Sequence, residues 1–121
     1  MNEPQSMVTL HAFLVRRADL THAEFLAHWR DVHGPLIRDT PALARHLVSY
    51  EQHAVIEGGR GGSPGYDGVA VQAFRSWEDF VAMLAEPAAR AMAEDEARFL
   101  DRDKLLVQFS TDCRVMIEDG S

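Results

Sequence analysis

Residues 25–36 read Phe25-Leu26-Ala27-His28-Trp29-Arg30-Asp31-Val32-His33-Gly34-Pro35-Leu36, and this stretch decides how the first half of the chain folds. Just before it, Thr21 and Glu24 form the T-x-x-E pattern of a capping box, so a helix is predicted to begin here. Apolar side chains recur at helical spacing and form one stripe, which consists of Phe25, Trp29, Val32 and Leu36. The Gly34-Pro35 pair is predicted to end the helix, because proline disfavours helical backbone for the residue before it.

His33 is the leading candidate for a catalytic residue. It lies four residues after Trp29, so it shares the apolar stripe in the last turn of the predicted helix. The negative end of the helix dipole favours the protonated imidazole, whereas apolar surroundings favour the neutral form. A histidine between these influences titrates near neutral pH, as general acid–base catalysis requires. The alternative is a structural histidine that bonds a backbone carbonyl at the helix end.

The composition is that of one globular domain over residues 1–121, with flexible tails expected at 1–6 and 118–121. Hydrophobic residues make up 46% of the chain, which is enough to bury a core. The net charge of −7 would be repelled by nucleic acid and by anionic membranes, so neither is an expected partner. The single cysteine, Cys113, rules out an internal disulfide and indicates a reducing compartment. The sequence has no signal-peptide pattern and no apolar run of membrane-spanning length, so a cytoplasmic protein is expected.

Hydrophobic periodicity predicts the order strand, helix, strand, strand, helix, strand. The expected strands cover residues 8–15, 46–56, 68–74 and 105–117, the last with an interruption near 110–112. The second helix begins after Ser76 as N-cap, breaks or kinks at Pro87 and continues over residues 88–100. The glycine-rich residues 58–65 form a loop that lacks the ending of a phosphate-binding loop. This order is that of an α+β ferredoxin-like sandwich, in which two main helices cover one face of a four-stranded antiparallel sheet.

The predicted sheet has more apolar surface than its own helices can cover. The strands at 8–15 and 68–74 are apolar on both alternating faces. A sheet with one solvated face alternates apolar with polar residues, so the second face is expected to be covered as well. A second copy of the chain is the simplest cover, and the sequence therefore predicts a barrel-like homodimer.

Several segments together resemble a known family. The pattern F-x-x-H-W-x-x-x-H-G-P-L at 25–36, followed by Pro41-Ala42-Leu43, is similar to the EthD family of small dimeric α+β barrel proteins. Segments 66–70, 74–79, 86–87 and 95–101 resemble later elements of the family in the same order, so the resemblance spans about residues 7–117. It implies the dimeric α+β barrel fold, and other members look like decarboxylases or dehydratases of aromatic polyketide pathways. The chain departs from the pattern at Val71-Gln72, where many relatives have an acidic residue, and over 87–90, where related cyclases have a histidine.

Two further polar residues are candidates for the chemistry. His11 lies mid-strand, and it either joins His33 in a pocket or faces a partner sheet, because a register slip of one residue reverses its side. Tyr50 is on the apolar face of its strand, where its phenol either orients a carbonyl or enolate oxygen or packs as a core tyrosine. The aromatic residues expected to wall the pocket are Trp29, Phe13, Phe74 and Phe99. For Trp29 the helical spacing favours a core position over a place in the site.

The remaining polar residues are interpreted as structural. No metal site is predicted, because the histidines lack ligand spacing. Cys113 is expected to be an inert thiol on the apolar side of the last strand. Asp67, Arg98 and Asp101 are interpreted as caps and salt bridges, and Glu94-Asp95-Glu96 as a solvated helix face.

These observations favour a small enzyme that needs no cofactor and acts on an apolar, aromatic or polyketide-like ketone. The reaction would be the proton transfer of a lyase, isomerase or cyclase, with His33 as acid or base and Tyr50 or His11 stabilising the oxyanion. One alternative is a non-catalytic protein that binds a hydrophobic metabolite or assists an oxygenase. Another is a monooxygenase that works without a cofactor.

Overall fold

The computed structural model describes residues 7–56 and 65–119, and the glycine-rich loop predicted at 58–65 lies almost wholly outside them. The strands are β1 (Val8–Leu14), β2 (Ser49–Ala54), β3 (Gly68–Phe74) and β4 (Leu106–Ser110). The helices are α1 (His22–His28), η1 (Trp29–His33), α2 (Gly34–Arg38), α3 (Pro41–Ala44), α4 (Trp77–Ala85), α5 (Ala89–Phe99) and η2 (Arg102–Lys104). No described helix is long and apolar enough to cross a membrane.

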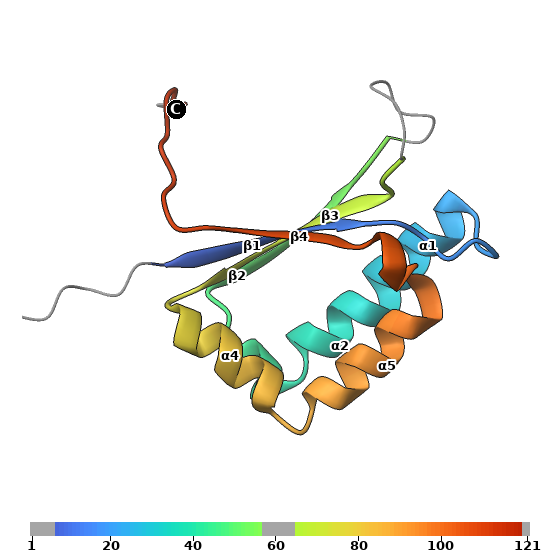
Figure 1. The fold of residues 1–121 in the computed structure, drawn as a ribbon, viewed down its shortest axis with the longest axis horizontal. Coiled ribbons are helices and arrows are strands. Elements are labelled where there is room, and N and C mark those ends of the chain that lie inside the picture. The colour runs from blue at the N-terminus through green and yellow to red at the C-terminus, as the bar shows by residue number, and fades with distance from the viewer. Residues whose placement is uncertain (1–6, 57–64, 120–121) are drawn as a thin grey trace, which may run out of the picture.

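The four strands form one antiparallel sheet in the order β2-β3-β1-β4. The main helices lie together on one face of this sheet, and the described chain leaves the other face uncovered (Figure 1). This is the predicted ferredoxin-like α+β arrangement. The helical face carries Leu10, Ala12 and Leu14 of β1, which pack in the core. Because strand residues alternate sides, His11 and Phe13 lie on the uncovered face.

The first long helix begins as predicted but does not end as predicted. Thr21 and Glu24 form the capping box, each side chain accepting from the backbone N–H of the other residue. The helix then continues through Gly34 and Pro35 to Arg38. The N–H of Gly34 bonds the carbonyl of Trp29 five residues earlier, which is a π turn. Pro35 occupies the first turn of the following α segment, where a missing N–H does little harm.

The π turn changes which residues face the core. The buried positions are four residues apart, at Phe25, Trp29, His33 and Ile37, whereas Val32 of the predicted stripe is 47% exposed. A spacing of four exceeds one α-helical turn, so a purely α-helical stripe would drift around the helix. The wider π turn corrects this drift and keeps His33 in line with Trp29. His33 is therefore a mid-helix residue, and the predicted influence of a helix end on it was wrong.

The second half of the chain follows its local signals more closely. Ser76 caps α4 by accepting from the N–H of Asp79, and the helix ends at Glu86, just before Pro87. The strand predicted at 68–74 is β3. The predicted last strand stops at Ser110 instead of continuing to 117, so Cys113 is exposed in an irregular segment rather than buried on a strand.

The core on the helical side has two neighbouring clusters. The first joins Trp29, Phe25 and Phe99 to β1 and β3. The second surrounds Phe74 and Met83. The Trp29 ring of the first cluster rests against Gly68 at the start of β3, where a Cβ would lie 2.4 Å from the nearest ring carbon.

Gly68→Ala is therefore expected to destabilise the fold, because the added methyl group forces the Trp29 ring to move. Overpacking of this kind costs about 1–3 kcal/mol of unfolding free energy, which urea denaturation measures. Gly65→Ala is the matched control: the structure describes no heavy atom within 4 Å of a Cβ there, so its effect should stay within about 0.5 kcal/mol. Equal stability of the two variants would contradict this packing.

Candidate acid–base site between the sheet and the helices

A cavity of about 200 Å³ lies between the sheet and the helices. Its lining is mostly apolar and includes Trp29 and Phe99. Four polar side chains also line it: His33, Tyr50, Gln72 and Glu96. An apolar cavity of roughly 150 Å³ holds benzene, so this space suits a compact ligand of about one ring.

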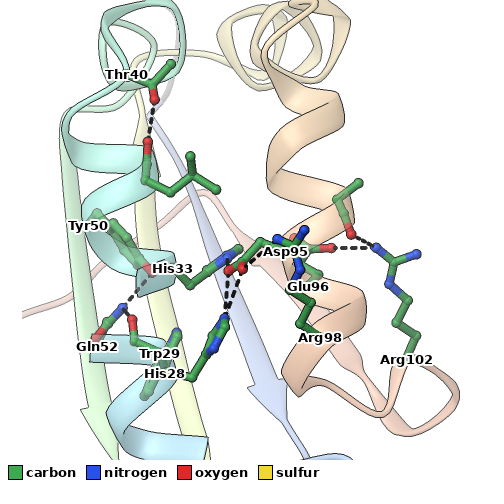
Figure 2. Close-up of polar contacts among 12 residues, drawn as sticks. His28, Trp29, His33, Thr40, Tyr50, Gln52, Asp95, Glu96, Arg98 and Arg102 are labelled. Atoms are coloured by element: carbon green, nitrogen blue, oxygen red, sulfur yellow. Dashed lines mark hydrogen bonds and ion pairs between the residues drawn. The ribbon is translucent and has the colours of Figure 1, made fainter. Parts of the chain in front are cut away.

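The Asp95 carboxylate organises the polar end of the site. Asp95 is on α5, is 1% exposed and lies between His28 and His33 of the first long helix (Figure 2). His33 Nδ1 is 2.8 Å from Oδ2, and His28 Nε2 is 2.9 Å from Oδ1. The Phe99 ring packs against both imidazoles, at centroid distances of 4.8 Å for His28 and 4.9 Å for His33. These contacts leave His33 little freedom to turn.

The charges in this cluster fix the proton on His33. Burial raises the pKa of Asp95, but hydrogen bonds from His33 and His28 outweigh burial and hold the pKa below its ordinary value. An ionised carboxylate only accepts, so the proton of neutral His33 is on Nδ1. Burial also lowers the pKa of His33. The hydrogen bond to Asp95 and the negative charge of that carboxylate raise the pKa, but they do not outweigh burial. At neutral pH His33 is therefore neutral, with the lone pair on Nε2.

The π turn and β2 are locked together beside this pair. The side-chain amide of Gln52 donates to the carbonyl of Trp29 and to the hydroxyl of Tyr50, both at 2.9 Å (Figure 2). Gly34 gives Gln52 the room to do so, since a Cβ at residue 34 would lie 2.7 Å from its Nε2. The Tyr50 oxygen accepts from Gln52, so its own O–H remains available as a donor. Burial raises the pKa of Tyr50, which keeps this phenol protonated at neutral pH.

The structure brings together four of the residues predicted for the site: His33, Tyr50, Trp29 and Phe99 line the cavity. Three others lie elsewhere. His11 is on the uncovered face, where its Nε2 is 3.1 Å from Ser110 Oγ. Phe13 is on that face too, beside Tyr66. Both are odd-numbered positions of β1, whose even positions face the helices. Phe74 faces the helices but packs in the neighbouring cluster, outside the cavity lining.

Asp95 and Glu96, which the sequence pattern had indicated to be solvated, both belong to the site. Asp95 is buried, and Glu96 lines the cavity, where burial raises its pKa despite Arg102 at 3.6 Å. A signal for Asp95 was present, because Met92, Asp95 and Phe99 share one helical face at spacings of three and four. The charged neighbours masked this pattern.

A second buried aspartate–histidine pair joins the other end of the first helix to the sheet. Asp67 Oδ1 is 2.7 Å from His22 Nδ1, and Asp67 also accepts from the backbone and guanidinium of Arg16 at 2.8 Å each. Burial raises the pKa of Asp67, but the bonds from His22 and Arg16 outweigh it and lower the pKa. The salt-bridge role predicted for Asp67 is therefore observed. The described residues contain no cluster of three or more His, Cys, Asp or Glu suited to a metal ion.

The fold and this site define a ferredoxin-like α+β protein with a histidine–carboxylate pair at an apolar cavity. The EthD domain model matches residues 17–103, which is most of the chain. The chain belongs to the EthD family.

Solved structures share the fold at low sequence identity. An ethyl tert-butyl ether D (EthD) family protein from Bacillus halodurans is 20% identical, with a TM-score of 0.66 over 88% of this chain and 99% of that one. The hydroxynitrile lyase of Passiflora edulis is 15% identical, with a TM-score of 0.65 over 95% and 100%. A dimeric ferredoxin-like protein of unknown function from Bacteroides fragilis is 14% identical, with a TM-score of 0.65 over 91% and 100%. No curated protein matches the sequence.

The lowered pKa of His33 predicts that acid weakens the fold. The unfolded chain takes up a proton at this histidine near pH 6.5, whereas the folded chain takes it up only at lower pH. The unfolding free energy should therefore fall as the pH drops below about 6.5, and His33→Gln should flatten this slope between about pH 6.5 and 5. Urea denaturation across that range measures both. A dependence of the unfolding free energy on pH that is the same in His33→Gln as in the wild type would contradict the prediction.

Proposed function

We propose that this protein is an enzyme that works without a cofactor and moves a proton on an apolar ketone of aromatic or polyketide-like character. The observation that carries the proposal is the His33 imidazole at the cavity, with Nδ1 held by the buried Asp95 carboxylate at 2.8 Å. A carboxylate in this position fixes the tautomer and stabilises the imidazolium that forms when Nε2 takes a proton. His33 is thereby suited to act as a general base at neutral pH.

The proposed chemistry begins with removal of the proton next to the ketone carbonyl. His33 Nε2 takes this proton, and the electrons of the broken C–H bond move toward the carbonyl oxygen to give an enolate. The protonated phenol of Tyr50 donates a hydrogen bond to that oxygen. In a β,γ-unsaturated ketone the enolate is a dienolate, and return of the proton from the imidazolium to its γ-carbon moves the double bond and gives isomerisation. Return of the proton to the same carbon gives exchange, and attack of an enolate on a second carbonyl of the ligand gives cyclisation.

The lining of the cavity and the fold both support this class of reaction. Apolar walls such as Trp29 and Phe99 favour an uncharged ring, and they exclude water that would compete for the proton. The fold is shared with the hydroxynitrile lyase from Passiflora edulis, so this architecture is compatible with a lyase. That likeness concerns the fold and supports no particular substrate for this chain.

His33→Gln is expected to abolish proton exchange at a ketone. The measurement follows deuterium incorporation into the methyl group of acetophenone in D₂O by NMR, with the protein present and absent. Loss of a general base lowers such a rate by about a hundredfold or more, so the variant should approach the protein-free rate. His53→Gln, far from the cavity lining, should keep the wild-type rate.

Asp95→Asn is expected to slow exchange and to move the acid limb of the pH–rate profile to lower pH, because the Asp95 carboxylate raises the pKa of His33.

Exchange that is unaffected by His33→Gln would remove this histidine from the mechanism. Ligand binding without exchange in the wild type would favour the non-catalytic binding or accessory role. Oxygen consumption with a phenolic ligand would favour the monooxygenase.

We also propose that two copies of the chain pair through the uncovered sheet face. No described element covers this face (Figure 1), which carries apolar side chains of three strands: Phe13, Val69, Val71 and Leu106. Contiguous apolar surface of this kind marks an interface in soluble proteins. The similar protein from Bacteroides fragilis is dimeric, which supports the same assembly here.

Val71→Asp is expected to convert the dimer into a monomer in analytical ultracentrifugation. Val71 lies opposite His11 and Glu51 on the adjacent strands, so the new carboxylate would be buried at the interface beside the carboxylate of Glu51. Val81→Asp makes the same change on the exposed side of α4 and should leave the dimer intact. A monomeric wild type, or a dimeric Val71→Asp variant, would contradict the proposed interface.

A further inference from the structure

The side chain of Gln72 is a polar group that the fold itself does not explain. Gln72 lies in the middle of β3, opposite Leu10 on β1 and Tyr50 on β2, and it is only 9% exposed. The flanking residues of the same face, Ala70 and Phe74, are apolar and buried. An apolar side chain at position 72 would serve the core at least as well.

The Gln72 amide forms no side-chain hydrogen bond within the described part of the chain. The other buried polar side chains there are all bonded: His22 to Asp67, His33 to Asp95, and Ser76 to the N–H of Asp79. None of the described side chains holds a fully enclosed polar atom without a partner. Each unpartnered amide atom of Gln72 therefore keeps some accessible surface, and Gln72 is one of the residues that line the cavity.

A buried amide that lacks a partner is costly, since burial removes its bonds to water. This amide has both a donor and an acceptor without a partner, and Gln72 is paired in register with Tyr50 on the neighbouring strand, whose side chain also lines the cavity. Lysine and arginine are absent from the described residues that line the cavity, so nothing there would balance an anionic ligand. The polar end of the site is therefore suited to an uncharged oxygen group.

We propose that the Gln72 side-chain amide is the ligand's polar anchor and donates to the carbonyl oxygen of an uncharged, compact ring ketone. With Tyr50 it forms a pair of donors on adjacent strands, on the side of the cavity that the sheet provides. The assignment of an enolate to this donor pair rests on the proposed proton-transfer function, whereas the anchoring of the ketone does not. Gln72 is thus a specificity-determining residue that favours ketones over hydrocarbons and carboxylates.

The test compares three probes of similar shape: acetophenone, ethylbenzene and benzoate. Titration of ¹⁵N-labelled protein, followed by NMR, gives the affinity of each probe and locates it through the resonances of cavity residues. The wild type should bind acetophenone about tenfold more tightly than ethylbenzene, as expected for one buried hydrogen bond, and should bind benzoate least. The side-chain NH₂ resonances of Gln72 should shift with acetophenone but not with ethylbenzene.

Gln72→Met keeps the length of the side chain and removes the amide. This variant should prefer the ketone over the hydrocarbon much less than the wild type does, keeping only what the Tyr50 O–H supplies, whereas Gln108→Met, on the uncovered face of β4, should keep the wild-type preference. The shift of the Gln72 NH₂ resonances is measured in the wild type, so it tests the proposal even if Gln72→Met folds poorly. A ketone preference that is undiminished in Gln72→Met, or acetophenone that leaves the cavity resonances and the Gln72 NH₂ unmoved, would overturn the proposal.

The same samples separate this inference from the proposed function. A ketone preference that depends on Gln72, in a wild type that exchanges no deuterium, would refute the enzyme and leave the anchor standing. Exchange that depends on His33 but is indifferent to Gln72→Met would support the enzyme and refute the anchor.

Discussion

The buried Asp95 carboxylate is the constraint on which the site depends. It joins α5 to the first long helix through two imidazoles, and it is nearly inaccessible to water. A carboxylate loses much favourable hydration on burial, so its hydrogen bonds must all be satisfied for the helices to pack in this way. Removal of either histidine leaves a charge that the remaining contacts offset only in part. The hydrogen bonds between Asp95 and the two histidines consequently stabilise the packing of the two helices and also set the protonation state of His33.

The geometry that brings His33 to Asp95 comes from an irregularity in the helix. A regular α-helix would carry residues spaced by four around its axis, and Ile37 would leave the face that holds Trp29. The π turn at Trp29–His33 keeps Trp29 and Ile37 on the core side. The side-chain amide of Gln52 donates a hydrogen bond to the Trp29 carbonyl within this turn. Gly34 is the small residue that allows Gln52 to approach. Irregular helical turns of this type occur frequently at functional sites, and here the turn places His33 at the lining of a cavity.

Local sequence signals predicted the fold better than they predicted the site. Capping boxes, alternation and turn residues act over a few positions, so Thr21, Ser76 and the strand at 68–74 were identified correctly. The role of Asp95 depends on partners 62 and 67 residues away, which no local period reports. The helix was expected to stop at Pro35 because proline disfavours helical backbone for the residue before it. That residue is Gly34, which has no Cβ to clash with the proline ring, and Pro35 lies in the first turn of α2. Phe13 was assigned to the pocket because β1 is apolar on both sides, and alternation alone does not say which side faces the helices.

The two aspartate–histidine pairs show how the surroundings decide what the same chemistry does. In both, a buried carboxylate accepts from an imidazole Nδ1 at nearly the same distance. Asp67 also accepts from the backbone and guanidinium of Arg16, and neither it nor His22 lines the cavity, so that pair serves to join β1, α1 and β3. Asp95 accepts from a second histidine, His28, and from the exposed Arg98 at 3.3 Å, and its partner His33 lines the cavity. The difference between the structural pair and the candidate catalytic pair is therefore that His33 lies at a space that a ligand can occupy, whereas His22 does not.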